Sequence, residues 1–314
     1  MMKLDKTELS LIGVAIAVAV VAQFSPNWLV FTLTLAISTA LVVMGVVMLM
    51  RAGLVSFGQG LFYCLGGYAV GLGGRFLGIT DALLLIGLGV VVTVAVAMLL
   101  GLLVTRYREI FFAMLSLAFS MILYGILVKS HGLGSTDGFG VKDWTLLWID
   151  PKGGEGSTTA LMLAIALGLA AALFLNRYFR SSIGLACEAI RENEVRVEYM
   201  GISRQQVLYI NYVLAAAIGS VGGSMAALAA GHVDPTMAYW TISGEFVFIA
   251  ILGGTGHVAA PFIAALIFTM VRTYAVELAP NAWQMILGIV LLLIILFLPK
   301  GIWSLFTRKK RAAS

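Results

Sequence analysis

Charged residues are scarce in this sequence. Only 11% of its 314 residues are Asp, Glu, Lys or Arg, and 61% are hydrophobic. Soluble domains carry about 25% charged residues, so this composition excludes both a soluble globular domain and a disordered chain. Cysteine is nearly absent too. Neither Cys64 nor Cys187 has a second Cys or a His at ligand spacing, which argues against a disulfide framework and a metal site.

The motifs of nucleotide binding and of hydrolytic catalysis are also missing. No Gly-x-x-x-x-Gly-Lys-Ser/Thr sequence occurs, so the chain has no P-loop for nucleotide phosphates. No Ser/His, Cys/His or His-Glu-x-x-His arrangement is present, and the three histidines are isolated. We therefore expect no enzymatic activity, cofactor or metal in this chain. The short basic tail at 307–311 is typical of a membrane-surface anchor rather than a nucleic-acid site.

Apolar runs long enough to cross a membrane dominate what remains. One span needs about 20 apolar residues, and the 35 glycines suit the close packing of membrane helices. We predict an all-α, polytopic transmembrane helical bundle of about ten spans. The predicted spans are 9–23, 28–50, 60–77, 82–104, 110–129, 159–176, 207–230, 241–255, 258–277 and 283–299.

The placement of Lys and Arg predicts the orientation. With the N-terminus inside, 15 of the 20 Lys and Arg residues fall in inner segments, which places both termini in the cytoplasm. The first run could instead be a cleaved signal peptide, but no clear cleavage site follows it, so we favour a retained helix. The Gly-rich outer loop, about 130–158, is too short for a separate domain. The sequence therefore predicts a single transmembrane domain over 1–314.

One predicted cytoplasmic segment, about 177–206, interrupts the apolar pattern. Its dense charges exclude it from hydrocarbon, where each would cost roughly 2.5–3.5 kcal/mol or more. The charged residues between 188 and 198 are Glu188, Arg191, Glu192, Glu194, Arg196 and Glu198.

The charged segment predicts a short helix. Ile190 and Val197 would share one side with Ala186 and Met200, and Gly201 would end the helix. From periodicity alone, a solvated connecting helix and a helix that docks a soluble partner are equally good interpretations.

Two breaks in the apolar pattern also fall on the predicted inner side. Near 53–60, Ser56, Gly58 and Gln59 bring polar and flexible residues into membrane-like sequence. Such a break indicates either a broken helix that lines a translocation route or a cytoplasmic turn followed by close glycine packing. Near 253–261, Gly253 and Gly254 form a similar break. The two breaks have the same predicted orientation, so they do not form an inverted repeat.

Two ionisable residues lie within predicted spans. Glu245 and Arg272 occur on adjacent spans, and a charge at membrane depth is a candidate functional group. The alternative is a structural ion pair between them, which we favour. Asp137 in the outer loop is interpreted as a turn residue because Asp-Gly is a common turn sequence.

Several segments together resemble the permease subunits of branched-chain (hydrophobic) amino-acid ABC importers, over residues of about 30–306. In chain order they are Gly53-Leu-Val-Ser-Phe-Gly-Gln-Gly with Gly66-Gly-Tyr-Ala, Arg108-Glu-Ile-Phe-Phe-Ala-Met-Leu-Ser-Leu-Ala-Phe, Gly184-Leu-Ala-Cys-Glu-Ala-Ile-Arg-Glu-Asn-Glu with Gly201-Ile, Ile251-Leu-Gly-Gly-Thr-Gly, and Pro299-Lys-Gly-Ile-Trp. The Ala-Ile-Arg-Glu-Asn-Glu sequence resembles the M-type of the two permeases in that family.

The resemblance implies an importer in a bacterial inner membrane. Its other subunits would be a second homologous permease, two ATPases that bind ATP and Mg, and a periplasmic solute-binding protein. The segment at 184–201 would couple to an ATPase, and the two breaks would lie near the pathway. The implied coupling residues are Glu188, Ile190, Arg191, Glu192, Asn193, Glu194, Val197 and Gly201. The candidate pathway residues are Ser56, Gly58, Gln59, Glu245, Gly253 and Gly254.

Departures from the family pattern leave the solute open. The outer-loop sequence Gly134-Ser-Thr-Asp-Gly differs from the Gly-Gly-Thr-Asn-Gly of many amino-acid members, so urea, short amides or aromatic acids are alternative solutes. An ion-coupled secondary transporter using Glu245, and a passive channel, are alternatives from other classes. Neither a secondary transporter nor a channel requires a helix that docks an ATPase.

Overall fold

The structure of the chain is a computed structural model that describes residues 6–147, 155–298 and 301–304. These residues are almost entirely helical, which confirms the predicted all-α class. The helices in chain order are α1 (Lys6–Gln23), α2 (Asn27–Arg51), α3 (Gln59–Phe76), α4 (Ala82–Val104), α5 (Glu109–Lys129), α6 (Glu155–Phe179), α7 (Ser182–Tyr199), α8 (Arg204–Ala230), α9 (Trp240–Gly253), α10 (Ala260–Leu278) and α11 (Trp283–Phe297). The 148–154 part of the predicted outer loop and the tail at 307–311 lie outside the described residues.

Each predicted apolar run overlaps one of these helices, and α7 is the charged segment. Six helices, α2, α4, α5, α6, α8 and α10, are long and apolar enough to cross a membrane. The helices α1, α9 and α11 are apolar but shorter. Among them, α9 has 14 residues and a length of about 21 Å at 1.5 Å per residue, less than the roughly 30 Å hydrocarbon core. The chain is thus a polytopic helical membrane protein.

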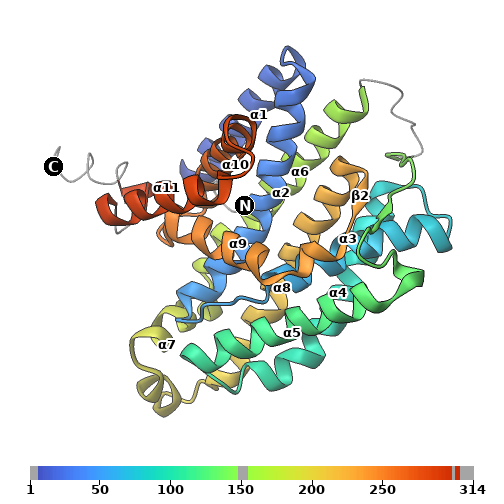
Figure 1. Cartoon of the computed structure of the whole chain (residues 1–314). Coiled ribbons are helices and arrows are strands. Elements are labelled where there is room, and N and C mark those ends of the chain that lie inside the picture. The colour runs from blue at the N-terminus through green and yellow to red at the C-terminus, as the bar shows by residue number, and fades with distance from the viewer. Residues whose placement is uncertain (1–5, 148–154, 299–300, 305–314) are drawn as a thin grey trace, which may run out of the picture.

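The helices α2 and α8 form the centre of the bundle (Figure 1). Every residue of α2 from 40 to 49 is buried, as expected for a helix that is apolar on all sides and surrounded by other helices. Glycines permit this close approach. A Cβ atom at Gly66, Gly222 or Gly223 would collide with a backbone carbonyl of a neighbouring helix, the small-residue packing typical of membrane bundles.

The bundle has two distinct ends (Figure 1). At one end lies α7. At the other, the short strands β1 (Phe139–Gly140) and β2 (His232–Val233) pair in antiparallel fashion, beside the 3₁₀ turns η1 (His131–Leu133) and η2 (Pro235–Ala238). The chain is non-helical between α2 and α3 and between α9 and α10, so both predicted breaks are confirmed.

Candidate functional site at the α7 junction

Local hydrogen bonds cap both ends of α7. The Ser181 side chain accepts a hydrogen bond from the Gly184 N–H at 3.3 Å. At the other end Gly201 has a φ of +84°, a left-handed conformation that glycine adopts without strain. The Ile202 N–H then donates to the Val197 carbonyl at 3.3 Å, as in a Schellman cap. The predicted stop at Gly201 is confirmed.

Asn193 interrupts α7 and divides it into two segments. Its backbone is extended, with φ −159° and ψ 98°, and its Oδ1 accepts a hydrogen bond from the Arg196 N–H at 3.0 Å. This is N-cap geometry, so Asn193 ends a first segment, 182–192, and starts a second, 194–199. The prediction of one short helix is corrected here, because Asn stabilises a helix start better than a helix interior.

The apolar side of α7 packs against the bundle. Ala186, Ile190 and Val197 are buried, as predicted, whereas Met200 is 61% exposed. The inclusion of Met200 on that side was wrong, since Met200 is the C-cap residue and lies past the helix end. Ile190 and Val197 contact their own chain, so their role is to seat α7 on the bundle rather than to anchor a partner.

A different set of apolar side chains points away from the bundle. Tyr199 is 89% exposed, and Val195 and Met200 are exposed beside it. Val195 and Tyr199 are four residues apart and lie on one face of the second segment. Sequence reasoning missed this surface because these residues alternate with charged ones. Their i, i+4 spacing was the available signal.

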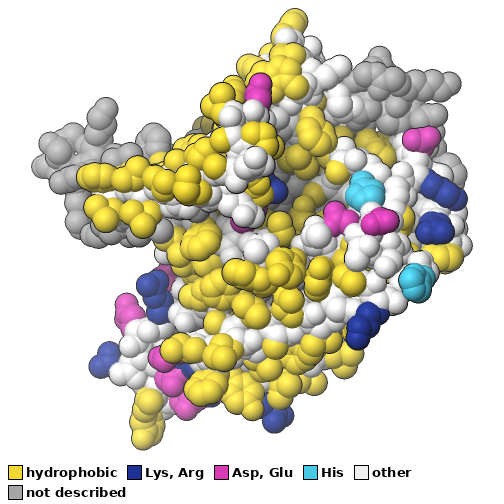
Figure 2. Space-filling view, viewed as in Figure 1, with side chains coloured by type: hydrophobic (Ala, Val, Ile, Leu, Met, Phe, Trp, Pro, Cys, Tyr) yellow, Lys and Arg dark blue, Asp and Glu magenta, His cyan; other side chains and the backbone are white. Residues whose placement is uncertain are grey.

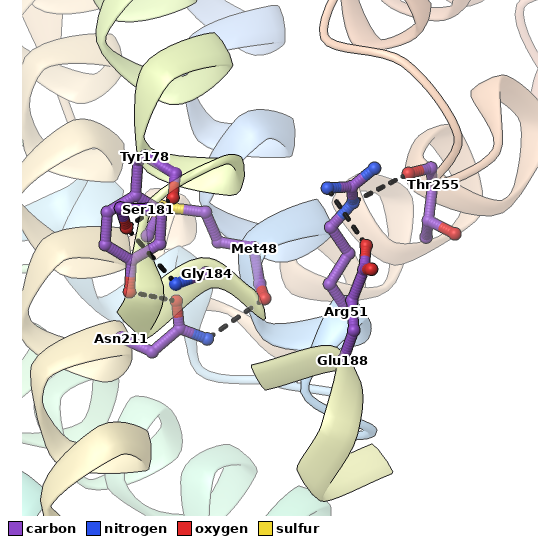
Figure 3. A network of polar contacts seen from close by, with 8 residues as sticks. All are labelled: Met48, Arg51, Tyr178, Ser181, Gly184, Glu188, Asn211 and Thr255. Carbon is purple, nitrogen blue, oxygen red and sulfur yellow. Dashed lines mark hydrogen bonds and ion pairs between the residues drawn. The ribbon is translucent and has the colours of Figure 1, made fainter. Parts of the chain in front are cut away.

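Arg51, the last residue of α2, connects α7 to three other parts of the bundle (Figure 3). Its Nη1 lies 3.2 Å from Oε1 of Glu188, and its Nε donates to the Thr255 carbonyl at 3.0 Å. The guanidinium also lies 3.9 Å from the ring centroid of Phe179, at the end of α6, a cation–π distance. One side chain therefore joins the first segment of α7 to the loop between α9 and α10.

The second segment of α7 has its own ionic anchor. Arg108, just before α5, forms an ion pair with Glu194. Arg204, at the start of α8, places Nη1 3.2 Å from the same carboxylate and Nε 3.7 Å from Glu198. The two segments of α7 are thus held to different helices, the first through Arg51 and the second through Arg108 and Arg204.

A buried polar network joins α6, α8 and α2 next to the start of α7 (Figure 3). The Tyr178 hydroxyl donates to Oδ1 of Asn211 at 3.3 Å, and the Asn211 amide donates to the Met48 carbonyl at 3.0 Å. Cys187 of α7 is buried nearby, and burial raises the pKa of its thiol to about 11. Among the described residues no group of three His, Cys, Asp or Glu side chains is placed to hold a metal ion.

The remaining predicted coupling residues are solvent-accessible. Glu188 is half exposed at its side chain despite its contact with Arg51. Arg191, Glu192, Asn193 and Gly201 are exposed, and Glu194 is partly buried. The Cγ of Arg191 lies close to Gly53 of the first break, so α7 contacts that break directly.

The polar side chains of the first break are buried, and serine hydroxyls accept hydrogen bonds from backbone N–H groups at this break. The Ser56 and Gln59 side chains are fully buried. Ser243 Oγ on α9 accepts a hydrogen bond from the Gly60 N–H at 2.9 Å, and Ser56 Oγ accepts one from Gly58 N–H at 3.2 Å. Both amide atoms of Gln59 have no hydrogen-bond partner among the described residues, a costly arrangement that is often found at functional positions.

The second break is held closely against neighbouring backbone. Gly253 ends α9, and a Cβ there would lie 2.9 Å from the Ala260 carbonyl oxygen. Gly254 has a φ of +83°, which favours glycine. The Ile302 N–H donates to the Leu252 carbonyl at 2.8 Å, so the described C-terminal residues pack on this break.

The predicted pairing of Glu245 with Arg272 is present. Glu245 Oε2 on α9 lies 3.1 Å from Nη1 of Arg272 on α10. The guanidinium lies 5.3 Å from the ring centroid of Trp283. This pair is separate from the contacts around α7. Glu245 lies in the first half of α9, whereas Arg51 contacts Thr255, just beyond the C-terminal end of α9.

A comparison with protein families gives a match over most of the chain. Residues 28–296 match the model of the family described as the branched-chain amino acid transport system permease component. The chain belongs to this family. The matched range contains both breaks and α7, and it leaves α1 outside.

Individual members of the permease family are distant relatives. The chain is 27% identical over 276 residues to the high-affinity branched-chain amino acid transport system permease protein LivM of Salmonella typhimurium, and 26% identical over 278 residues to LivM of Escherichia coli. Both matches cover 80% of this chain and 64% of LivM. LivH of Salmonella typhimurium is 24% identical over 300 residues, covering 86% of this chain and 92% of LivH. No solved structure matches the chain.

Proposed function

We propose that this chain is a transmembrane permease subunit of an ATP-driven importer for branched-chain or other hydrophobic amino acids, and that it takes the LivM-type position. It forms half of the translocation pathway beside a second, homologous permease. Two ATPase subunits bind ATP and Mg on the cytoplasmic side, and a periplasmic solute-binding protein delivers the solute. Family membership and the identity to LivM support this assignment. The chain itself needs no cofactor and contacts membrane lipid, not nucleic acid.

The observation that carries the proposal is the construction of α7. It is a charged, capped helix with a buried side on the bundle and an exposed apolar face at Val195, Tyr199 and Met200. A helix with an exposed apolar face among charged residues is suited to bind in a groove of another protein. We assign that groove to an ATPase subunit, with Arg191, Glu192 and Asn193 at the rim of the contact.

Coupling then follows the two anchors of α7. Movement of the ATPase pair displaces the first segment, which acts through Glu188 and Arg51 on the Thr255 loop. The second segment acts through Glu194 on Arg108 and α8. These contacts reach both breaks, which line the pathway with Ser56, Gly58, Gln59, Gly253 and Gly254. Glu245 lies on α9, ahead of the second break in the chain.

The chain crosses a bacterial inner membrane ten times, with both termini in the cytoplasm. The distribution of Lys and Arg supports this orientation, and the short α9 fits a span that ends at the irregular second break. Family membership argues against an ion-coupled transporter that uses Glu245.

The proposal is tested by purifying the tagged full chain from its own cells in mild detergent and identifying the proteins that accompany it. We expect two ATPase subunits and a second permease, and ATP-dependent valine uptake once the complex and its binding protein are placed in liposomes. Tyr199→Asp should remove the ATPases, because a charge on the 89%-exposed ring position disrupts the apolar contact. Leu77→Asp, an exposed position at the β1–β2 end, is the matched control and should retain them.

Two other results would redirect the assignment. A chain that purifies alone and transports without ATP would contradict the importer class. ATP-driven uptake of urea, a short amide or an aromatic acid, without valine uptake, would keep the class and change the solute.

A further inference from the structure

The Glu245–Arg272 pair is partly exposed although both residues lie within predicted membrane spans. The Arg272 side chain is 43% exposed and that of Glu245 19%, although α10 is one of the helices that can span a membrane. A charge turned toward hydrocarbon is expensive. The exposed side of this pair must therefore face water, protein or solute.

The free hydrogen-bonding capacity lies on the exposed guanidinium. Arginine has five N–H donors. Arg272 donates from Nη1 to Glu245, and its Cζ lies over the Trp283 ring, 5.3 Å from the ring centroid. Among the described residues its other nitrogens make no hydrogen bond. The Trp283 contact fixes the plane of the guanidinium, which leaves a donor edge that fits a carboxylate in a bidentate manner.

Apolar side chains share the helix faces that carry the two charges. Phe248 lies three residues after Glu245, and Val276 lies four residues after Arg272. Both are partly exposed, and such spacings place side chains on one face. Figure 2 shows that the surface is hollowed beside α10, with hydrophobic side chains around much of the hollow. The charges are thus bordered by apolar surface.

The pair is also connected to the first break. Ser243, two residues before Glu245 on α9, accepts the Gly60 N–H hydrogen bond at the start of α3. The helix that carries Glu245 therefore contacts the segment proposed to line the pathway.

We propose that Glu245 and Arg272 form a subsite for the zwitterionic head group of the transported amino acid. The solute carboxylate binds the free donor edge of Arg272, the solute ammonium binds Glu245, and the branched side chain rests on the apolar border. A solute with adjacent opposite charges matches this pair, whereas urea and neutral amides carry no such charges. This inference rests on the proposed function, since it names the chemistry by which the permease recognises its solute.

The test compares assembled importers in liposomes, supplied with saturating binding protein and radiolabelled valine. E245Q/R272Q removes both charges together, so neither residue is left as a charge without its partner. A zwitterion subsite predicts that valine uptake per assembled complex falls more than tenfold. E8Q/R177Q is the matched control, because Glu8 and Arg177 form a pair at 3.0 Å between α1 and α6. It should retain uptake within about twofold.

The reversed pair, E245R/R272E, provides the test if the complex with E245Q/R272Q fails to assemble. It restores an ion pair but inverts the charges that the solute meets, so lost uptake in an assembled complex supports the subsite. Valine uptake within twofold of wild type by either double variant overturns the subsite and leaves the proposed function intact. A wild-type complex that takes up no valine with ATP would instead contradict the proposed function.

Discussion

At the scale of single residues, the shape of the Arg51 side chain matters as well as its charge. Its guanidinium contacts the Glu188 carboxylate, the Thr255 carbonyl and the Phe179 ring at once. Lysine keeps the charge, but its compact ammonium cannot bridge two acceptors and also stack on a ring. Geometry therefore specifies arginine at this position.

We expect Arg51→Lys to leave the protein folded and assembled but to lower ATP-driven valine uptake roughly tenfold, a size typical of coupling between sites. Arg106→Lys is the matched control at an exposed arginine near Arg108, and uptake should stay within about twofold. Uptake per assembled complex, measured in proteoliposomes, provides the comparison. Equal uptake by the two variants would mean that Arg51 contributes only its charge.

The sequence identified several residues of the site but not their partners. Glu188, Glu194 and Arg51 are recognisable as charges outside the apolar runs, because charge and hydropathy are local properties. Their pairing depends on how α2, α5 and α8 pack around α7, which no local pattern contains. The unpartnered amide of Gln59 likewise depends on the burial created by distant helices.

At the scale of elements, α7 is two short helices with separate anchors. Its first segment is tied to α2 through Arg51, and its second is tied to α5 and α8 through Glu194. In the coupling that we propose, the extended backbone at Asn193 lets each segment transmit its own displacement. The kink is consequently part of the coupling mechanism we propose.

Asn193→Ala should therefore reduce coupling. Alanine removes the internal cap, at a cost of about 0.5–2 kcal/mol, and favours a continuous helix through position 193. We expect fewer valine molecules transported per ATP hydrolysed. Asn193→Ser keeps a capping oxygen and should preserve the ratio. The same ratio for both variants would contradict a role for the kink.

The helices were more predictable than their bends. Each of the ten apolar runs overlaps a helix, because a membrane span requires a long hydrophobic segment that the sequence shows directly. The kink at Asn193 and the exposure of Met200 were not predicted, since the cap and the helix end decide them within one or two residues.

At the scale of the whole molecule, the arrangement separates a cationic end from a neutral core. The α7 end carries Arg51, Arg106, Arg108 and Arg204, whereas α2 and α8 are buried in the centre. Cytoplasmic loops of membrane proteins are enriched in such cations. The α7 end is therefore the end we assign to the cytoplasm, where an ATPase could reach it.

Cysteine labelling of intact cells tests that orientation. Native Cys64 and Cys187 are buried, and a thiol with a pKa of about 11, as at Cys187, is scarcely ionised at pH 7, so the unaltered chain should not react with a membrane-impermeant maleimide. Lys142→Cys, exposed near β1, should be labelled in cells whose outer membrane alone is opened. Arg106→Cys and Ser314→Cys should be labelled only after the inner membrane is opened. The reverse pattern would place α7 outside the cell and exclude ATPase docking there, because ATP is supplied from the cytoplasm.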